Sequence, residues 1–257
     1  MKKLYDKSEL TFTLVWIGIY VVLGSLANPI SDAIGIHSSA HAIVNVVMAV
    51  VLLSFVLKNG LAERYGLRRP VYPARTFLFY FPLIVLATVN LWFGAVMNLP
   101  PAGLACYLIS MCAVGILEEL IFRGLLFRAM AENNLTAAVI VSSITFGLGH
   151  IVNLFNGRGE DLFSALATVI TAIAIGFLFV MVFHRGGSLL PCIICHSLVD
   201  MTSAFANAAA FTPTVEIAIR AGEIVMIAVY LLIITKTTPK PVAPATPPAL
   251  AASDGAE

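Results

Sequence analysis

Residues 104–124 read LACYLISMCAVGILEELIFRG, and this stretch decides which fold the chain can adopt. From Leu104 to Leu117 it contains no charged residue, and Glu118, Glu119 and Arg123 then follow in close succession. A charge at the centre of a bilayer costs about 2.5–3.5 kcal/mol on insertion scales. The stretch therefore predicts a membrane helix whose charged residues are either neutralised by partners or kept for a function.

The composition of the whole chain agrees with a membrane protein. Of its 257 residues, 60% are hydrophobic and 11% are charged, and the mean hydropathy is +0.95. Soluble domains are typically about 45–50% apolar and about 25% charged. The sequence therefore indicates an integral protein of the lipid bilayer. The net charge of +1, without a run of basic residues, indicates no nucleic-acid partner.

Apolar stretches of spanning length recur along the chain and predict an all-α, polytopic membrane protein with about eight transmembrane helices. We expect these helices at residues 10–29, 38–57, 75–97, 102–129, 135–156, 162–184, 187–208 and 214–235. The breaks between them carry Pro, Gly or Asn, as at Asn28-Pro29 and Gly186-Gly187. The first apolar run, of about 18–20 residues, favours an uncleaved helix over a signal peptide.

The distribution of lysine and arginine predicts how the helices are oriented. With eight spans, 13 of the 15 Lys and Arg residues share a side with both termini, and only Arg158 and Arg220 lie opposite. We therefore expect the N- and C-termini to be cytoplasmic, in a bacterial cell (inner) membrane.

Four cysteines lie in apolar segments, so we expect small buried side chains and no disulfide framework: Cys106, Cys112, Cys192 and Cys195. The residues from Cys192 to His196 also fit C-x-x-C-H, a c-type haem attachment signature. They lie near the predicted cytoplasmic end of an apolar helix, whereas haem c is attached on the translocated side. This position disfavours haem.

Helix geometry separates the two adjacent glutamates. Successive residues of a helix point about 100° apart, and residues four apart share a face. Glu119 therefore faces Arg123, with the acid first, which is the favourable order for an ion pair. The residue four positions after Glu118 is Phe122, which cannot pair with it. We expect Glu119 and Arg123 to pair for structure and Glu118 to stay available as a general base.

Two further motifs place polar residues inside predicted helices. TFGLGH sets Phe146 and His150 four apart, with Asn153 near the same face, and HSLVD sets His196 and Asp200 four apart. Each residue alone could be an interhelical hydrogen-bonding partner, but an intramembrane ionisable residue is by default a candidate for a functional site.

The predicted depths of these residues indicate that they converge. If the turn between two helices lies near Asn134, then Glu118 and His150 are level in an antiparallel hairpin. His196 and Asp200 lie about 14 and 20 Å into the seventh predicted helix. Polar side chains from three helices at a similar depth predict one site.

The three motifs together resemble a known family. EELIFR matches an EExxxR motif, FGLGH matches FxxxH, and HSLVD matches an HxxxN/D-type motif. Their order on successive membrane segments resembles the CAAX protease and bacteriocin-processing (CPBP or Abi) family of intramembrane endopeptidases, which includes type II CAAX prenyl endopeptidases. The resemblance covers about residues 104–205.

The resemblance implies hydrolysis of a peptide bond without a cofactor and without a covalent enzyme intermediate. Glu118 would activate a water together with His150, and His196 would stabilise the oxyanion with Asp200 as its helper. The family pattern has asparagine at the last position, and an aspartate donates a hydrogen bond only when it is protonated. Either Asp200 stays neutral or it only orients His196.

The resemblance also gives roles to the supporting residues and divides the chain. Glu119 and Arg123 correspond to the structural pair, and Phe146 would line the site, with Asn153 close by. We expect N-terminal transmembrane helices (1–103), a catalytic core (104–208), a last transmembrane helix (209–236) and a disordered Pro/Ala-rich tail (237–257). The expected substrate is a membrane-associated or C-terminally processed protein or peptide, reached through a site that opens toward the cytoplasm.

Two other functions remain open. Glu118, His150 and His196 have the composition of some catalytic zinc sites, which would make the chain a zinc-dependent intramembrane protease. A buried polar cluster also occurs in ion pathways, so the chain could be a non-enzymatic membrane immunity factor or a transporter. Transporters often repeat such features in two halves, whereas here the polar residues concentrate in the second half.

Overall fold

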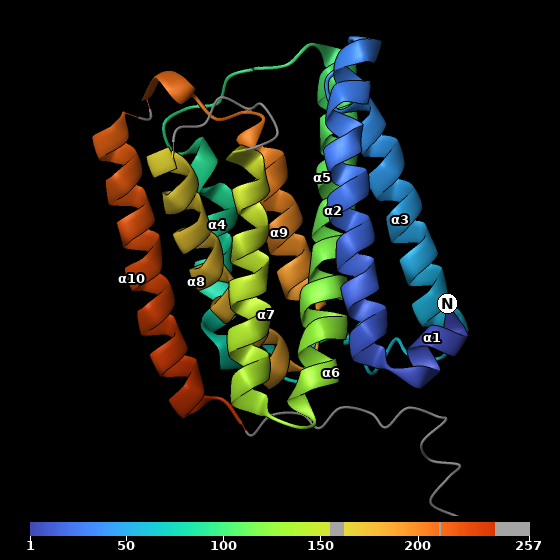
Figure 1. Ribbon diagram of the computed structural model, residues 1–257. Coiled ribbons are helices and arrows are strands. Elements are labelled where there is room, and N and C mark those ends of the chain that lie inside the picture. The colour runs from blue at the N-terminus through green and yellow to red at the C-terminus, as the bar shows by residue number, and fades with distance from the viewer. Residues whose placement is uncertain (155–161, 211, 240–257) are drawn as a thin grey trace, which may run out of the picture.

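The computed structural model describes residues 1–154, 162–210 and 212–239, and these residues form a helical bundle without a strand (Figure 1). The one β-type pairing among them is an isolated bridge between Ala95 and Ala206. Most of the predicted tail, from residue 240 onward, lies outside the described residues. The predicted all-α, polytopic class is confirmed, since 7 helices in the described part of the chain are long and apolar enough to cross a membrane.

The helices follow one another along the chain in antiparallel order (Figure 1). The first half comprises α1 (Lys2–Lys7), α2 (Glu9–Ile34), α3 (Ser39–Lys58), η1 (Ala74–Tyr80), α4 (Phe81–Thr88) and η2 (Val89–Leu91). The second half comprises α5 (Pro101–Glu118), η3 (Glu119–Leu126), α6 (Phe127–Ala131), α7 (Leu135–Gly149), η4 (His150–Leu154), α8 (Leu162–Gly186), α9 (Leu190–Ser203), η5 (Ala208–Ala210) and α10 (Pro213–Thr237). Seven of the eight predicted spans therefore have a long helical counterpart.

Three predicted helix bounds were wrong. Pro29 lies inside α2, which continues to Ile34 and ends at Gly35 with a left-handed φ of 76°. A membrane helix tolerates proline because neighbouring groups satisfy the freed backbone. The third predicted helix ends at Leu91 instead of residue 97. The seventh, α9, has only 14 residues, which is about 21 Å of helix and shorter than a hydrocarbon core of about 30 Å.

The bundle has two ends, which we call the terminal end and the far end. The terminal end carries α1, the 59–73 segment, the 186–189 turn and the close of α10 (Figure 1). It is tied together by the Val71 N–H donating to Gly186 O (3.1 Å) and by Arg185 Nη1 donating to Pro239 O (3.1 Å). The far end carries residues 35–38, 92–100 and 204–210.

A polar network fixes the first helices at the terminal end. The buried Arg64 guanidinium pairs with Glu9 at the start of α2 (2.6 Å) and with Glu132 after α6 (2.8 Å). The Tyr65 hydroxyl donates to the same Glu9 carboxylate (2.7 Å) and lies 2.8 Å from the Tyr5 hydroxyl. Burial, and then the Glu9 charge, raise the pKa of the Tyr65 phenol far above its usual range.

Close helix contacts position the middle of the bundle. A Cβ atom added to Gly115 of α5 would lie 2.8 Å from the backbone nitrogen of Ser197 in α9. A Cβ added to Gly176 of α8 would lie 2.9 Å from the backbone of Ser143 in α7. Small residues let membrane helices approach this closely. The π-helical segment η3 interrupts the regular helix after Glu118, and all its residues are buried; such segments are frequent at functional sites.

Candidate active site

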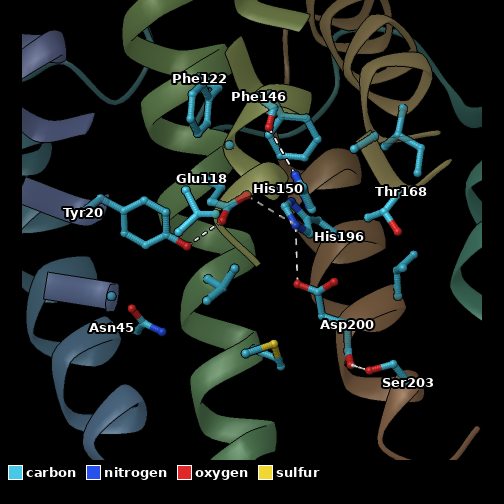
Figure 2. A pocket seen from close by; sticks show the side chains of 18 of the residues that line it. Tyr20, Asn45, Glu118, Phe122, Phe146, His150, Thr168, His196, Asp200 and Ser203 are labelled. Atoms are coloured by element: carbon cyan, nitrogen blue, oxygen red, sulfur yellow. Dashed lines mark hydrogen bonds and ion pairs between the residues drawn. The ribbon is translucent and has the colours of Figure 1, made fainter. Parts of the chain in front are cut away.

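A cavity of about 520 Å³ lies among α2, α3, α5, α7, α8 and α9, and all four predicted catalytic side chains line it (Figure 2). Glu118 is the last residue of α5, His150 follows the end of α7, and His196 and Asp200 lie on α9. Helices far apart in sequence therefore bring the predicted residues together at one place.

Glu118 has a partner that the sequence did not predict. The Tyr20 hydroxyl, from α2, donates to Glu118 Oε1 at 2.5 Å (Figure 2). The second carboxylate oxygen, Oε2, lies 3.8 Å from His196 Nε2. The sequence analysis considered only partners on the same helix, and Tyr20 comes from a different helix. One oxygen is held by Tyr20, and the other faces the imidazole.

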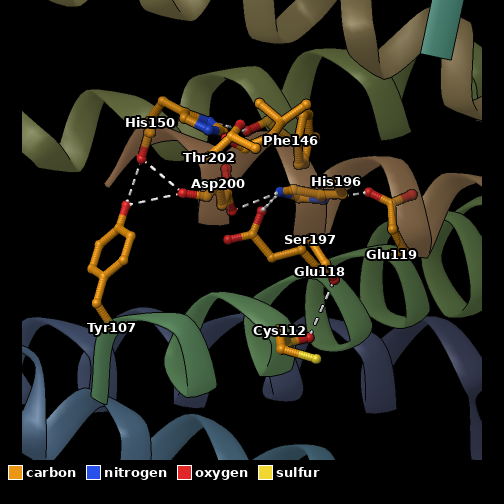
Figure 3. Close-up of polar contacts among 12 residues, drawn as sticks. Tyr107, Cys112, Glu118, Glu119, Phe146, His150, His196, Ser197, Asp200 and Thr202 are labelled. Atoms are coloured by element: carbon orange, nitrogen blue, oxygen red, sulfur yellow. Dashed lines mark hydrogen bonds and ion pairs between the residues drawn. The ribbon is translucent and has the colours of Figure 1, made fainter. Parts of the chain in front are cut away.

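His196 lies between carboxylates on both sides of its ring. Its Nδ1 is 2.8 Å from Glu119 Oε1, and its Nε2 is 3.4 Å from Asp200 Oδ2 (Figure 3). A carboxylate only accepts hydrogen bonds when ionised, so Nδ1–H donates to Glu119. The ring is buried, with Nε2 facing Glu118 and Asp200.

The predicted pair of Glu119 and Arg123 is present, and it is fully buried. Arg123 Nη1 lies 2.9 Å from Glu119 Oε1, and both side chains are 0% exposed. The guanidinium carbon lies 3.8 Å from the centroid of the Phe146 ring and 5.3 Å from that of Phe179, so the rings stabilise its charge. Because Glu119 Oε1 also accepts from His196, this pair is joined directly to the site.

His150 differs from His196 in the group that its Nδ1 contacts. That nitrogen lies 3.2 Å from the carbonyl oxygen of Phe146. A carbonyl cannot donate, so Nδ1 carries the proton and Nε2 is left as an acceptor. The Phe146 ring has edge contacts with His150 at 5.2 Å and with His196 at 5.6 Å between centroids, which keeps both rings in place. The side chain of Asn153 lies outside the described residues.

Sequence reasoning missed the cavity residues that come from the first helices. Tyr20 and Asn45 both line the cavity, and the buried Asn45 donates to Ser110 at 3.0 Å. The sequence contains a feature that could have pointed to each of these two residues. Tyrosine in membrane helices favours the interfaces, whereas Tyr20 lies near the middle of α2, and Asn45 is a polar residue within an apolar helix.

The residues that suggested a metal or haem lie in the cavity and inside α9. Among the described residues, no group of three or more His, Cys, Asp or Glu side chains could hold a metal ion. The thiols of Cys192 and Cys195 are buried and donate to the carbonyls of Phe179 and Leu83. Thiols enclosed in this way do not fit covalent attachment of haem. All four cysteines are free, but the expectation of four buried side chains was wrong, since Cys112 is exposed and Cys106 is half-buried on the lipid-facing part of a membrane helix.

The cavity extends toward the far end of the bundle. Its floor is made by the buried rings of Phe122, Phe146 and Phe179, and its rim includes the exposed Gly149 and Ser203 near the far ends of α7 and α9. The sequence led us to expect both cytoplasmic termini and a cytoplasmic site. These two expectations are incompatible, because the cavity and the termini lie toward opposite ends.

Comparison with known proteins identifies the segment that holds the site. Residues 100–202 match the family model described as Type II CAAX prenyl endopeptidase Rce1-like. The matched segment is similar to this family. The Rce1-like segment is less than half of the chain, and it contains Glu118, His150, His196 and Asp200 but not Tyr20 or α10. No curated protein and no solved structure matches the chain. This similarity supports a CAAX-protease-type intramembrane endopeptidase in general terms.

Proposed function

We propose that the chain is a glutamate-dependent intramembrane endopeptidase that hydrolyses a peptide bond without a metal ion. The observation that carries this proposal is the position of Glu118, with one oxygen fixed by Tyr20 and the other facing His196 across the cavity. A carboxylate with one oriented oxygen beside a cavity is suited to general-base catalysis.

In the proposed reaction, Glu118 takes a proton from a water that also donates to His150 Nε2. The hydrogen bond from His150 Nδ1–H to Phe146 O keeps that Nε2 an acceptor. The water oxygen bonds to the carbonyl carbon of the peptide, and the carbonyl oxygen becomes an oxyanion. The carbon–nitrogen bond then breaks, and the proton held by Glu118 passes to the leaving amine.

His196 would stabilise the oxyanion through Nε2–H. Since its Nδ1–H already donates to Glu119, this role requires the doubly protonated, cationic imidazole. The carboxylates of Glu118, Glu119 and Asp200 surround the ring at 3.8, 2.8 and 3.4 Å, and their charges favour a cation there. Of the two roles considered for Asp200, we therefore propose that it orients and charges His196 without donating itself.

The proposal is tested by the peptide termini in membranes that contain wild-type protein or the Glu118→Gln variant. Termini that depend on wild-type protein and disappear with Glu118→Gln are expected. The matched control is Glu63→Gln, because Glu63 is an exposed residue of the terminal end that pairs with Arg68. Identical termini in all three membranes, with an unchanged biological phenotype, would favour the immunity-factor or transporter function.

Activity in the presence of a strong chelator separates the metal-free reaction from the zinc alternative. We expect cleavage of an identified substrate to continue after exhaustive chelation. Loss of cleavage that added Zn²⁺ restores would replace the proposed mechanism with a metal-dependent one.

The charge distribution carries a second part of the proposal, the location of the protein. We propose that it lies in a bacterial inner membrane with its terminal end in the cytoplasm, since the terminal end carries most of the Lys and Arg residues.

A further inference from the structure

The cavity has a polar wall that leads from the buried site to the far end. Its polar lining residues outside the catalytic set come from α2, α3, α5, α8, α9 and α10 and from the region of η2, and include Asn28, His41, Asn90, Tyr107, Thr168, Ser203 and Arg220. Polar side chains in membrane helices are expected to face a bundle interior or a water-filled cavity. This wall therefore marks the route by which a hydrated chain reaches Glu118.

Packed helices block access to the site from the terminal end of the bundle. Below the floor of phenylalanine rings, α2 contacts η3 and α6, and every residue of η3 is buried. The 59–73 segment is bound to the 186–189 turn, where the Leu189 N–H donates to Gly66 O at 2.8 Å. A peptide cannot reach the site through this packing, so access lies at the far end.

The two ends also differ in charge. Of the 13 Lys and Arg residues that the structure describes, 11 lie toward the terminal end, Arg123 is buried at the site and Arg220 lies on the far side. On the far side, Arg220 pairs with Glu216 at 2.8 Å, and the sequence places Asp32 and Glu223 there as well. Lys and Arg near an anionic cytoplasmic leaflet contribute about 1 kcal/mol each. A bundle inserted with its cavity toward the cytoplasm would have to translocate almost all of its basic residues.

We propose that the cavity opens on the extracytoplasmic side of the membrane and that the substrate is a polypeptide segment presented there. The substrate class rests on the proposed protease activity, whereas the direction of opening rests only on the proposed orientation with the terminal end in the cytoplasm. A cytoplasmic protein with a processed C-terminus would meet only the blocked terminal end.

The direction is tested by cysteine labelling in intact spheroplasts, in a background with Cys106, Cys112, Cys192 and Cys195 replaced by alanine. Three single variants report on three places. Met97→Cys reports on the far end, where the Met97 side chain is 70% exposed. Met111→Cys reports on the cavity wall. Val71→Cys reports on the terminal end, where the Val71 side chain is 46% exposed. The probe is a sulfonated maleimide that does not cross membranes.

We expect Met97→Cys and Met111→Cys to be labelled from outside, and Val71→Cys only after the membrane is permeabilised. The reverse pattern would overturn the proposal. A green fluorescent protein fused after the last residue of the otherwise wild-type chain gives a second readout that does not depend on how the cysteine variants fold. Fluorescence is expected with a cytoplasmic C-terminus, and its absence in correctly inserted full-length protein would contradict the proposed orientation.

The substrate class is tested by mapping the termini that depend on Glu118. They are expected to lie in segments exposed on the extracytoplasmic side, and termini confined to cytoplasmic segments would overturn the substrate claim. The labelling needs no catalysis. If Met97→Cys and Met111→Cys are labelled from outside but no termini depend on Glu118, the proposed protease fails while the direction of the cavity stands.

Discussion

The two ends of the bundle use charged residues in opposite ways. At the terminal end, Arg64 is enclosed between Glu9 and Glu132, so that each charge has a partner of opposite sign. At the cavity, Glu118 and Asp200 both face the His196 ring, which is a cation only when it is doubly protonated. An arginine that is always charged holds helices together through its ion pairs, whereas a histidine that can gain or lose a proton beside a cavity is suited to catalysis. Substitutions at the terminal end should therefore change stability, and those at the cavity should change catalysis.

The largest effect is expected where the two kinds of region meet, at Arg123. Arg123→Ala leaves Glu119 as a buried charge without its cation, which should lower the free energy of unfolding by about 3–5 kcal/mol. Unfolding in mixed detergent micelles measures this loss. Arg123→Lys is the control, because it keeps the charge but not the flat contact with Phe146, and it should cost less. An Arg123→Ala variant as stable as wild type would show that the pair is not structural.

His196→Ala should reduce kcat by about 10²–10³, the usual effect of losing one oxyanion donor. Single-turnover cleavage of an identified substrate measures the rate. The matched control is His37→Ala, since His37 is exposed at the far end and lies outside the cavity lining. A variant that loses stability but keeps the wild-type rate per folded molecule would remove His196 from the mechanism.

Glu9→Gln tests the terminal end. It weakens the hydrogen bonds from Arg64 and Tyr65, and bonds to charged groups contribute about 1.5–3 kcal/mol each. We expect the free energy of unfolding to fall by an amount in that range, with kcat per folded molecule unchanged. Glu63→Gln removes a more exposed pair and should change stability by only about 0–1 kcal/mol. A fall in kcat with Glu9→Gln would mean that the two ends are coupled.

The smallest effect is expected for Tyr20→Phe, which removes only the hydroxyl that orients Glu118. We expect kcat to fall about tenfold, equivalent to about 1.4 kcal/mol, while KM stays the same. Tyr230→Phe is the matched control, because the Tyr230 hydroxyl donates to Phe77 O at 2.8 Å, away from the cavity lining. If KM rises and kcat is unchanged, Tyr20 contacts substrate instead of positioning the base.

Local patterns in the sequence were enough to predict the helical spans and the Glu119–Arg123 pair. Apolar length determines whether a segment can span, and a spacing of four residues determines which side chains meet on one helix. Contacts between distant segments leave no such pattern. Tyr20 reaches Glu118 across 98 residues, and Arg64 reaches Glu9 across 55.

The errors in helix bounds have the same origin. Pro29 was predicted to end a helix because proline leaves a backbone group unpaired. In the folded bundle, neighbouring helices satisfy such groups, and the sequence alone does not show these neighbours. The short α9 looked like a full span because residues after Ser203 are apolar, although they leave the helix and meet the 92–100 segment. The direction of the cavity depends on how all the spans pack, and no single motif records it.

The shared oxygen of Glu119 has an evolutionary consequence. Because Oε1 accepts from both Arg123 and His196, the residue that lets η3 remain inside the membrane is also the residue that fixes the proton on the proposed oxyanion donor. A mutation at Glu119 is exposed to selection twice, once through insertion and folding and once through turnover. Descendants of this protein that lose the reaction should therefore change Glu118 or His150 first and keep Glu119 and Arg123 longest.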